Sequence, residues 1–253
     1  MNAPIITDEQ FNSLIAFRQA AYACLGNARD AQFDLADAVL LTPAANSFAE
    51  LSLSPVFRRR WASVYEAIQD GRPDREALLR LYIAHIPTAF RPLLAGDHTA
   101  WPHLSAPTLR ERTIEHQPTK IIGQKPITIG QGFSTLAWIP PEGGSWANPL
   151  LNERISSPET PIGKASSQLR RVCQNLPVRP ISLWDAEYGN ATFVNETADI
   201  PADKIVRLRP NLCLLGPPPP YAGHGRPAVH GRKFKLKDST TWDPAVEVLG
   251  RRP

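Results

Sequence analysis

The stretch that decides the fold is residues 179–190, which read RPISLWDAEYGN. Its apolar residues Ile181, Leu183 and Trp184 predict a strand buried inside a sheet. Asp185 follows directly, at the carboxyl end of that strand, which is where open α/β sheets bind their ligands. The stretch therefore predicts an interior strand with an acidic side chain at the edge where a ligand site is expected.

A second aspartate ends another apolar run in the same way. Asp97 follows Leu93, Leu94 and Ala95 in the segment RPLLAGDHTAW. If the two strands are neighbours, the carboxylates of Asp97 and Asp185 converge and repel each other unless a cation lies between them. Oxygen ligands select a hard ion such as Mg²⁺ or Mn²⁺, and two such ions about 4 Å apart promote phosphodiester cleavage. Taken singly, each aspartate is more typical of a turn or a cap.

The rest of the chain predicts helices first and a mixed sheet afterwards. Helical patterns start at Thr7, Ser54 and Asp74, in TDEQFNSLIAFRQAAYACLG, SPVFRRRWASVYEAIQDG and DREALLRLYIAHI. Strands are expected in RPLLAGDHTAW, KPITIGQGFSTLAWIP and GSWANPLLNERIS, and a loop in SAPTLRERTIEHQPTK. A helix from Pro158 to Asn175, the strand RPISLWD, a short helix or turn in NATFVNETAD and the strand KIVRLR follow. This order is that of an α/β domain with a mixed sheet.

Composition narrows the class of protein. The chain has 253 residues, of which 42% are hydrophobic, and no apolar run is long enough to span a membrane. Its start lacks the basic and apolar pattern of an export signal, so a cytoplasmic protein is expected. Three distant cysteines support neither a disulfide framework nor a zinc site. The tryptophans expected to pack in the core are Trp101, Trp138, Trp146 and Trp184.

The basic residues are unevenly distributed, although the net charge is only +4. From Lys204 to Lys237 no acidic residue interrupts them. Beyond Arg209 the sequence is rich in proline and allows only short strands, at Cys213–Leu215 and Lys233–Leu236. Such a segment favours a polyanion, usually nucleic acid, although a solvated face is an equally common explanation. The candidate DNA contacts, which we expect to hold phosphates without base specificity, are Arg226, Arg232, Lys233, Lys235 and Lys237.

Several ordered motifs together resemble one family. LLAGDHTAW, APTLRERTIEHQP, KPITIGQGFSTLAWIP, GSWANPLLNERISSPETPIGKA and RPISLWDAEYGNATFVNETADI are similar to bacterial insertion-sequence transposases with a DDE-type, ribonuclease-H-like catalytic domain. The resemblance implies that Asp97 and Asp185 are the first and second catalytic acids and bind Mg²⁺ or Mn²⁺. It also implies that the substrate is DNA at the ends of an insertion sequence.

This chain departs from that family's pattern at the third acid. The resemblance implies a Glu on a helix after the fifth strand, and no helical pattern follows KIVRLR. The later acids are Asp238, Asp243 and Glu247. Glu247 lies in the strand-like AVEVL, so we expect a C-terminally truncated, inactive domain with an incomplete metal site. Glu187 is a further candidate ligand if the strand continues past Asp185, although a turn at Tyr188 and Gly189 favours another direction.

These expectations divide the chain into a helical N-terminal region (1–88), an incomplete ribonuclease-H-like core (89–209) and a truncated, proline-rich basic insertion (210–253). A DDE transposase is the leading interpretation. Two alternatives stay open: a DNA-binding remnant without catalysis, and a metal-free hydrolase that uses the carboxylates as general acid and base. The sequence also leaves open whether the protein forms a homodimer.

Overall fold

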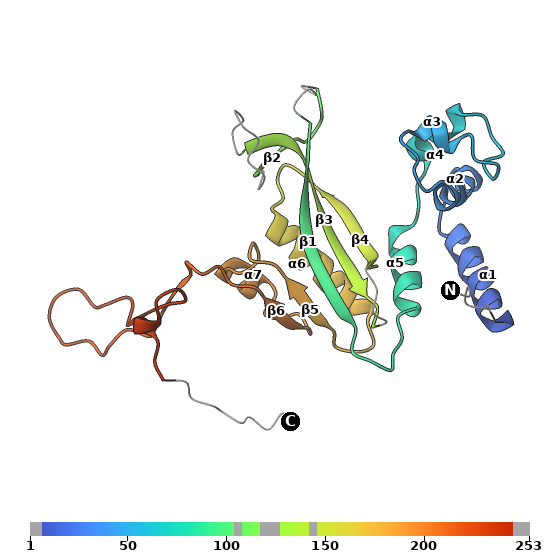
Figure 1. Ribbon diagram of the computed structural model, residues 1–253. Helices are drawn as coiled ribbons and strands as arrows, with labels where there is room; N and C mark the ends of the chain where they lie inside the picture. The colour runs from blue at the N-terminus through green and yellow to red at the C-terminus, as the bar shows by residue number, and fades with distance from the viewer. Residues whose placement is uncertain (1–6, 104–107, 117–126, 142–145, 245–253) are drawn as a thin grey trace.

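Helices precede a six-stranded mixed sheet in the computed structural model of this protein (Figure 1). The structure describes residues 7–103, 108–116, 127–141 and 146–244. The helices before the sheet are α1 (Asp8–Ala23), α2 (Arg29–Leu41), α3 (Phe48–Leu51), α4 (Ala62–Asp70) and α5 (Arg75–Ala84). Among these described residues, no helix is both long and apolar enough to cross a bilayer.

Capping residues mark the starts of some of these helices and not of others. Thr7 accepts a hydrogen bond from the Gln10 amide while the Gln10 side chain accepts one from the Thr7 amide, which is the expected capping box. Helices α2 and α3 were not predicted; the N-cap residue of α2, Ala28, makes no side-chain hydrogen bond that would mark its start, whereas Ser47 caps the single turn of α3. Helix α4 begins at Ala62, later than the expected Ser54, because residues 52–61 form turns and bends.

The sheet contains antiparallel and parallel pairs. Its strands are β1 (Leu93–Pro102), β2 (Thr113–His116), β3 (Ile127–Ile139), β4 (Asn148–Ile155), β5 (Ile181–Trp184) and β6 (Asp203–Val206). Strands β1, β2 and β4 each pair with β3 antiparallel, whereas β5 pairs with β1 and β6 with β5 in parallel. Strand β2 lies where a loop was expected, so that expectation was wrong. The expected mixed α/β class is confirmed.

Two helices make the crossovers that parallel strands require. Helix α6 (Pro161–Asn175) joins β4 to β5, and α7 (Ala191–Glu196) joins β5 to β6. Each starts at a side-chain cap: Thr160 accepts from the Gly163 amide and Asn190 from the Phe193 amide. The caps fix where each helix begins, and so the path of the chain between the strands.

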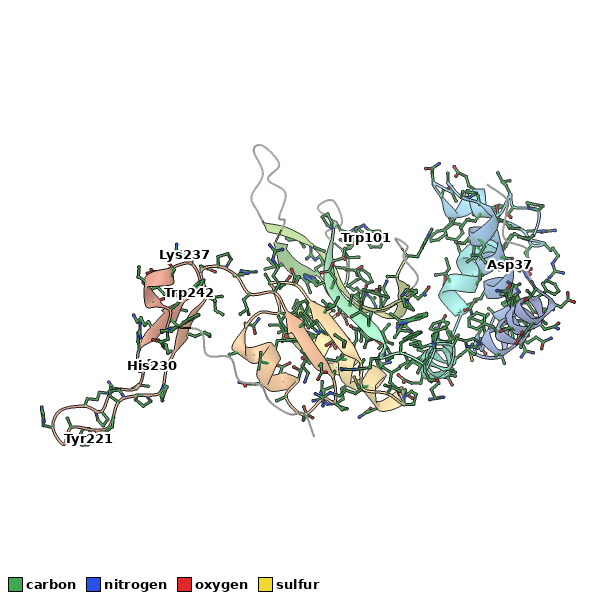
Figure 2. The ribbon with its side chains drawn as sticks, turned by 60° about the horizontal axis from the view of Figure 1, so that its bottom comes forward. Asp37, Trp101, Tyr221, His230, Lys237 and Trp242 are labelled. Atoms are coloured by element: carbon green, nitrogen blue, oxygen red, sulfur yellow. The ribbon has the colours of Figure 1, made fainter. Side chains whose placement is uncertain are left out.

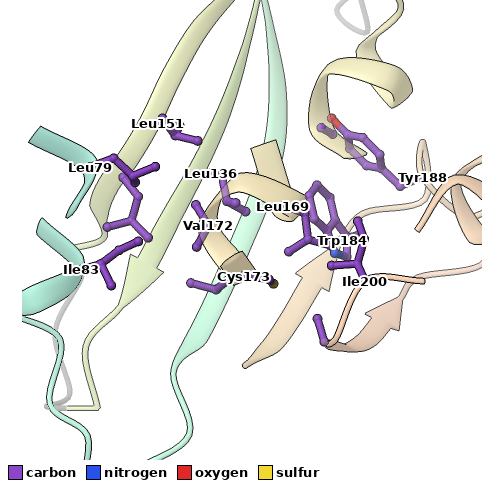
Figure 3. Close-up of a cluster of buried hydrophobic side chains, with 14 of the residues drawn as sticks. Leu79, Ile83, Leu136, Leu151, Leu169, Val172, Cys173, Trp184, Tyr188 and Ile200 are labelled. Atoms are coloured by element: carbon purple, nitrogen blue, oxygen red, sulfur yellow. The ribbon is translucent and has the colours of Figure 1, made fainter. Parts of the chain in front are cut away.

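The core lies between one face of the sheet and helices α5 and α6. Leu136 of β3 and Leu169 and Val172 of α6 are fully buried, and Leu79 of α5 is nearly so. Figure 3 shows Val172 beside Leu136 and Leu169 beside Trp184. Burial of each such side chain contributes roughly 2 kcal/mol relative to exposure. This one-sided core determines which face of the sheet stays accessible.

The other face of the sheet is open. Figure 1 shows α6 behind the sheet, and no helix of the described residues crosses the face turned to the viewer. Leu94 and Gly96 of β1 face α6, so Asp97, Thr99 and Trp101 face the open side. Trp101 is 58% exposed for this reason. Trp146 is 82% exposed as well, so the expectation of core packing was wrong for these two tryptophans.

Ion pairs fix the strand ends opposite the aspartates. Arg91, just before β1, and Arg179, just before β5, both pair with Asp203 at the start of β6, at N···O distances of 2.5 and 2.6 Å. The hydrogen bond from Arg91 and the nearby charge of Arg179 lower the pKa of the Asp203 carboxyl. These contacts join the three parallel strands at their amino ends and so support their register.

A small hairpin follows the sheet. Strands β7 (Cys213–Leu215) and β8 (Lys233–Lys235) pair antiparallel, and the 3-10 turn η1 (Ser239–Thr241) packs beside β8. The Phe234 and Trp242 rings stack at 5.9 Å, and the Trp242 indole N–H donates to the Lys235 carbonyl at 2.8 Å. The two short strands agree with those expected in this segment.

Candidate metal centre and nucleic-acid interface

Strand pairing brings the two predicted carboxylates together. Gly96 lies opposite Trp184 in the parallel ladder of β1 and β5, so the next residues, Asp97 and Asp185, are neighbours. Adjacent strands are about 4.8 Å apart. Because Trp184 is buried on the α6 side, the alternation of side chains turns Asp185 to the open face together with Asp97. Both residues are exposed at the carboxyl end of β5.

A close approach of Gly96 and Trp184 supports this alignment. A Cβ atom at Gly96 would lie 2.0 Å from the Trp184 ring. That ring is 5% exposed and packs on Tyr188 and Phe193, at centroid distances of 4.9 and 4.7 Å. The indole therefore occupies the space that a side chain at Gly96 would need. Gly96 directly precedes Asp97, so this contact lies next to the aspartate pair.

The chain turns sharply after Asp185. Its Oδ1 accepts a hydrogen bond from the Glu187 amide at 2.8 Å, and the Asn190 side-chain amide donates to the Glu187 carbonyl at 2.8 Å. The Glu187 carboxylate lies 3.6 Å from Nδ1 of His98, whose side chain is 9% exposed and alternates away from Asp97. The turn thus orients the Asp185 carboxylate and places Glu187 against His98.

The described residues contain no group of three or more His, Cys, Asp or Glu side chains arranged to hold a metal ion. The two aspartates are therefore the pair that the structure brings together, and Glu187 lies two residues further along the turn. Of the later acids, Asp238 and Asp243 lie in or beside the hairpin, and Glu247 falls outside the described residues.

Tyr188 is a residue near this pair that sequence reasoning missed. It is fully buried, and its hydroxyl finds no hydrogen-bond partner in the described parts of the chain. Burial, with the charges of Glu187, Asp97 and Asp185, raises the pKa of the phenol above its usual value. The hydroxyl therefore stays protonated beside the carboxylates. Its position three residues after Asp185 was the one signal available in the sequence.

Tyr188→Phe is expected to leave the free energy of unfolding unchanged or to raise it by about 1 kcal/mol, because a buried hydroxyl without a partner costs free energy in the folded state. Urea denaturation followed by circular dichroism measures the change. The control is Thr197→Val, which removes a buried hydroxyl that donates to the Phe193 carbonyl at 2.8 Å and should cost about 1 kcal/mol. A loss at Tyr188→Phe as large as the control's would contradict the prediction.

The candidate DNA contacts all lie in or beside the hairpin, and all are exposed. Two of them have acidic neighbours from beyond the basic segment: Arg232 pairs with Asp243, and the Lys235 ammonium lies 3.9 Å from Asp238. The remaining three are Arg226, Lys233 and Lys237. The hairpin is thus less positively charged than the segment from Lys204 to Lys237 alone indicates.

Lys204, the first cation of that segment, has a structural role. Its ammonium donates hydrogen bonds to the carbonyls of Thr197 and Ile200, in the turn after α7. Burial, with the charge of Arg179, lowers its pKa. The positive surface available to a polyanion therefore starts later in the chain than the sequence indicates.

Comparison with known proteins identifies a family for this chain. The family model described as DDE superfamily endonuclease matches residues 21–252, which include both aspartates, all six strands of the sheet and the hairpin. No curated protein matches the sequence. Together with the mixed sheet and the helices before it, the family match confirms the expected ribonuclease-H-like fold class.

Proposed function

The chain belongs to the DDE superfamily endonucleases, and we propose that it is an insertion-sequence transposase, which cuts and joins DNA at the ends of its element. The observation that carries this proposal is the register of β1 and β5, which sets Asp97 beside Asp185 on an open face. We assign these two carboxylates as catalytic metal ligands. Glu187 is a further ligand only if its side chain leaves His98.

The donor chemistry of the pair fits one hard divalent cation. Mg²⁺ in proteins is usually held by one or two carboxylates together with substrate phosphates, and it keeps several waters. Asp97 and Asp185 supply two such carboxylates, and the open face leaves room for DNA. Once bound, Mg²⁺ or Mn²⁺ would supply a Lewis acid that lowers the pKa of water and stabilises a leaving oxygen. The Glu187 amide holds Asp185 in place for this task.

The remaining parts of the chain have separate tasks in this proposal. Residues 1–88 are a helical region ahead of the catalytic core at 89–209, and residues 210–253 are an insertion that contacts DNA phosphates. With two aligned carboxylates, and no three-residue group among the described side chains, this chain binds metal weakly and turns over slowly or not at all. A cytoplasmic location, where chromosomal DNA is accessible, completes the proposal.

Metal binding and DNA nicking test the proposal together. We expect purified protein to bind Mn²⁺, observed by electron paramagnetic resonance, and any nicking of supercoiled plasmid to require Mg²⁺ or Mn²⁺ and stop with EDTA. The physical reason is that two neighbouring carboxylates bind a divalent cation more favourably than either does alone. Nicking that continues in EDTA would support the metal-free hydrolase, and absence of Mn²⁺ binding would refute the metal site.

A DNA-binding remnant without catalysis is the second candidate function. It is favoured by the exposed cations of the hairpin and by the finding that no three acidic, His or Cys side chains of the described residues are arranged to hold a metal ion. It requires DNA binding that weakens as salt rises, because phosphate contacts release counterions. The same assay separates the two functions, since a remnant binds DNA without metal-dependent nicking under any condition.

A further inference from the structure

Residues 217–230 form a long loop between β7 and β8 whose sequence the fold does not explain. Every residue of this loop is exposed. Hydrogen bonds at its base, from the Gly216 amide to the Arg232 carbonyl and from the Gly231 amide to the Gly216 carbonyl, hold its two ends together. Figure 2 shows the loop extending away from the sheet, with Tyr221 near its far end.

The far end of the loop carries two glycines in left-handed backbone conformation and is held partly by its own contacts. Gly223 and Gly225 have φ angles of +84° and +74°, and nothing lies within 4 Å of where a Cβ would be at either residue. The Tyr221 hydroxyl donates to the Gly225 carbonyl at 3.0 Å. Four consecutive prolines before Tyr221 restrict the approaching backbone. The next residue after this turn is Arg226, which Pro227 follows.

Arg226 differs from the other arginine among the candidate DNA contacts. Arg232 pairs with Asp243, whereas no ion pair of Arg226 is found within the described residues. The loop itself contains no acidic residue. The Arg226 guanidinium is therefore available for an external anionic surface. Its position just after the two glycines, in a loop that extends away from the sheet, favours entry into a groove over contact with a flat phosphate surface.

We infer that this loop enters the minor groove of A·T-rich duplex DNA and that Arg226 recognises the groove by its narrow width. The minor groove of B-DNA is about 6 Å wide, so a backbone without side chains at Gly223 and Gly225 is suited to it. A-tracts narrow the groove further and strengthen its negative potential, which attracts arginine. This inference rests on the proposed function for its DNA substrate, and it adds a base-composition preference that phosphate contacts alone do not give.

The test measures binding of the full chain to two fluorescein-labelled duplexes of equal length, one with a central A·T tract and one with G·C in its place. Fluorescence anisotropy in EDTA keeps metal chemistry out of the measurement. We expect about tenfold tighter binding to the A·T duplex. A small minor-groove ligand should displace the protein from that duplex, and Arg226→Ala should reduce its affinity to that for the G·C duplex.

Arg232→Ala is the matched control, since Arg232 belongs to the same hairpin and pairs with Asp243. It should lower both affinities equally or leave both unchanged, and so keep their ratio. Equal binding of the two duplexes by the wild-type protein, or an unchanged ratio in Arg226→Ala, overturns the inference. Neither result affects the metal-dependent nicking that tests the proposed function, so the two failures are distinguishable.

Discussion

Asp97→Asn and Asp185→Asn should each lower the affinity for Mn²⁺ by about tenfold or more, which corresponds to ~1.4 kcal/mol of binding free energy. Each change removes one of the two neighbouring carboxylates. The same change should stabilise the metal-free protein by about 0.5 to 1 kcal/mol, because two like charges on neighbouring strands, whose backbones are about 4.8 Å apart, no longer repel each other. Melting curves with and without Mn²⁺ measure both effects, and any metal-dependent nicking should be lost in both variants.

The two expected effects have opposite signs: the affinity for Mn²⁺ falls while the stability of the metal-free protein rises. This combination is specific to a cation site that both aspartates share. The matched control is Glu66→Gln, which removes an exposed carboxylate on α4 and should change neither quantity. A structural role for the aspartates would instead make both variants less stable without metal. Unchanged Mn²⁺ affinity in the two asparagine variants would show that the aligned carboxylates do not hold the ion.

The strands of the sheet could largely be predicted from local sequence, but their pairing could not. Apolar alternation marks β1, β3 and β5, and an aspartate follows the apolar part of both β1 and β5. That Asp97 lies beside Asp185 depends on a ladder between distant parts of the chain, which begins with Leu93 opposite Ile181. From the sequence, the two aspartates are neighbours only if their strands pair. The structure shows that the strands do pair, and in which register.

The elements that sequence reasoning missed have weak local signals. Strand β2 has only four residues, Thr113–His116, inside a polar segment with prolines on either side. Trp101 is a large apolar residue of β1, yet it lies on the face that no described helix covers, opposite the buried Leu94 and Gly96. Periodicity predicts that a strand has two faces, but packing partners elsewhere in the chain decide which face is buried.

The ion pairs of the hairpin could not be predicted from the neighbouring sequence either. The segment from Lys204 to Lys237 has no acidic residue, so it predicts an unbroken positive surface. Asp243 lies 11 residues after Arg232, and the turn through η1 brings the two together. Composition thus overestimates the positive charge of the hairpin surface, and Arg226 is the hairpin arginine for which the described part of the chain shows no ion pair.

Gly96→Ala should destabilise the protein by about 3 kcal/mol, because the new methyl group would lie 2.0 Å from the Trp184 ring. An exposed ring would simply move aside. This ring is held by Tyr188 and Phe193, so the strands themselves must separate. Since native stability is typically about 5–15 kcal/mol, the loss is a large fraction of the total. Urea denaturation of the full chain measures it.

Gly163→Ala is the matched control for this change. Its new methyl group would lie 3.2 Å from Thr160 Oγ1 in the first turn of α6, and alanine favours helix, so the change should stay within about 1 kcal/mol.

A second variant tests the cause directly. If the indole is the obstacle, Trp184→Leu combined with Gly96→Ala should cost less than the sum of the two single changes, since the smaller side chain leaves space for the methyl group. Additive losses would place the strain elsewhere. Gly96 precedes Asp97 and Trp184 precedes Asp185, so separating the two strands should also disturb the aspartates. The stabilisation by Mn²⁺ should therefore be smaller in Gly96→Ala than in the wild-type protein. In the double variant, both this stabilisation and the stability without metal should recover.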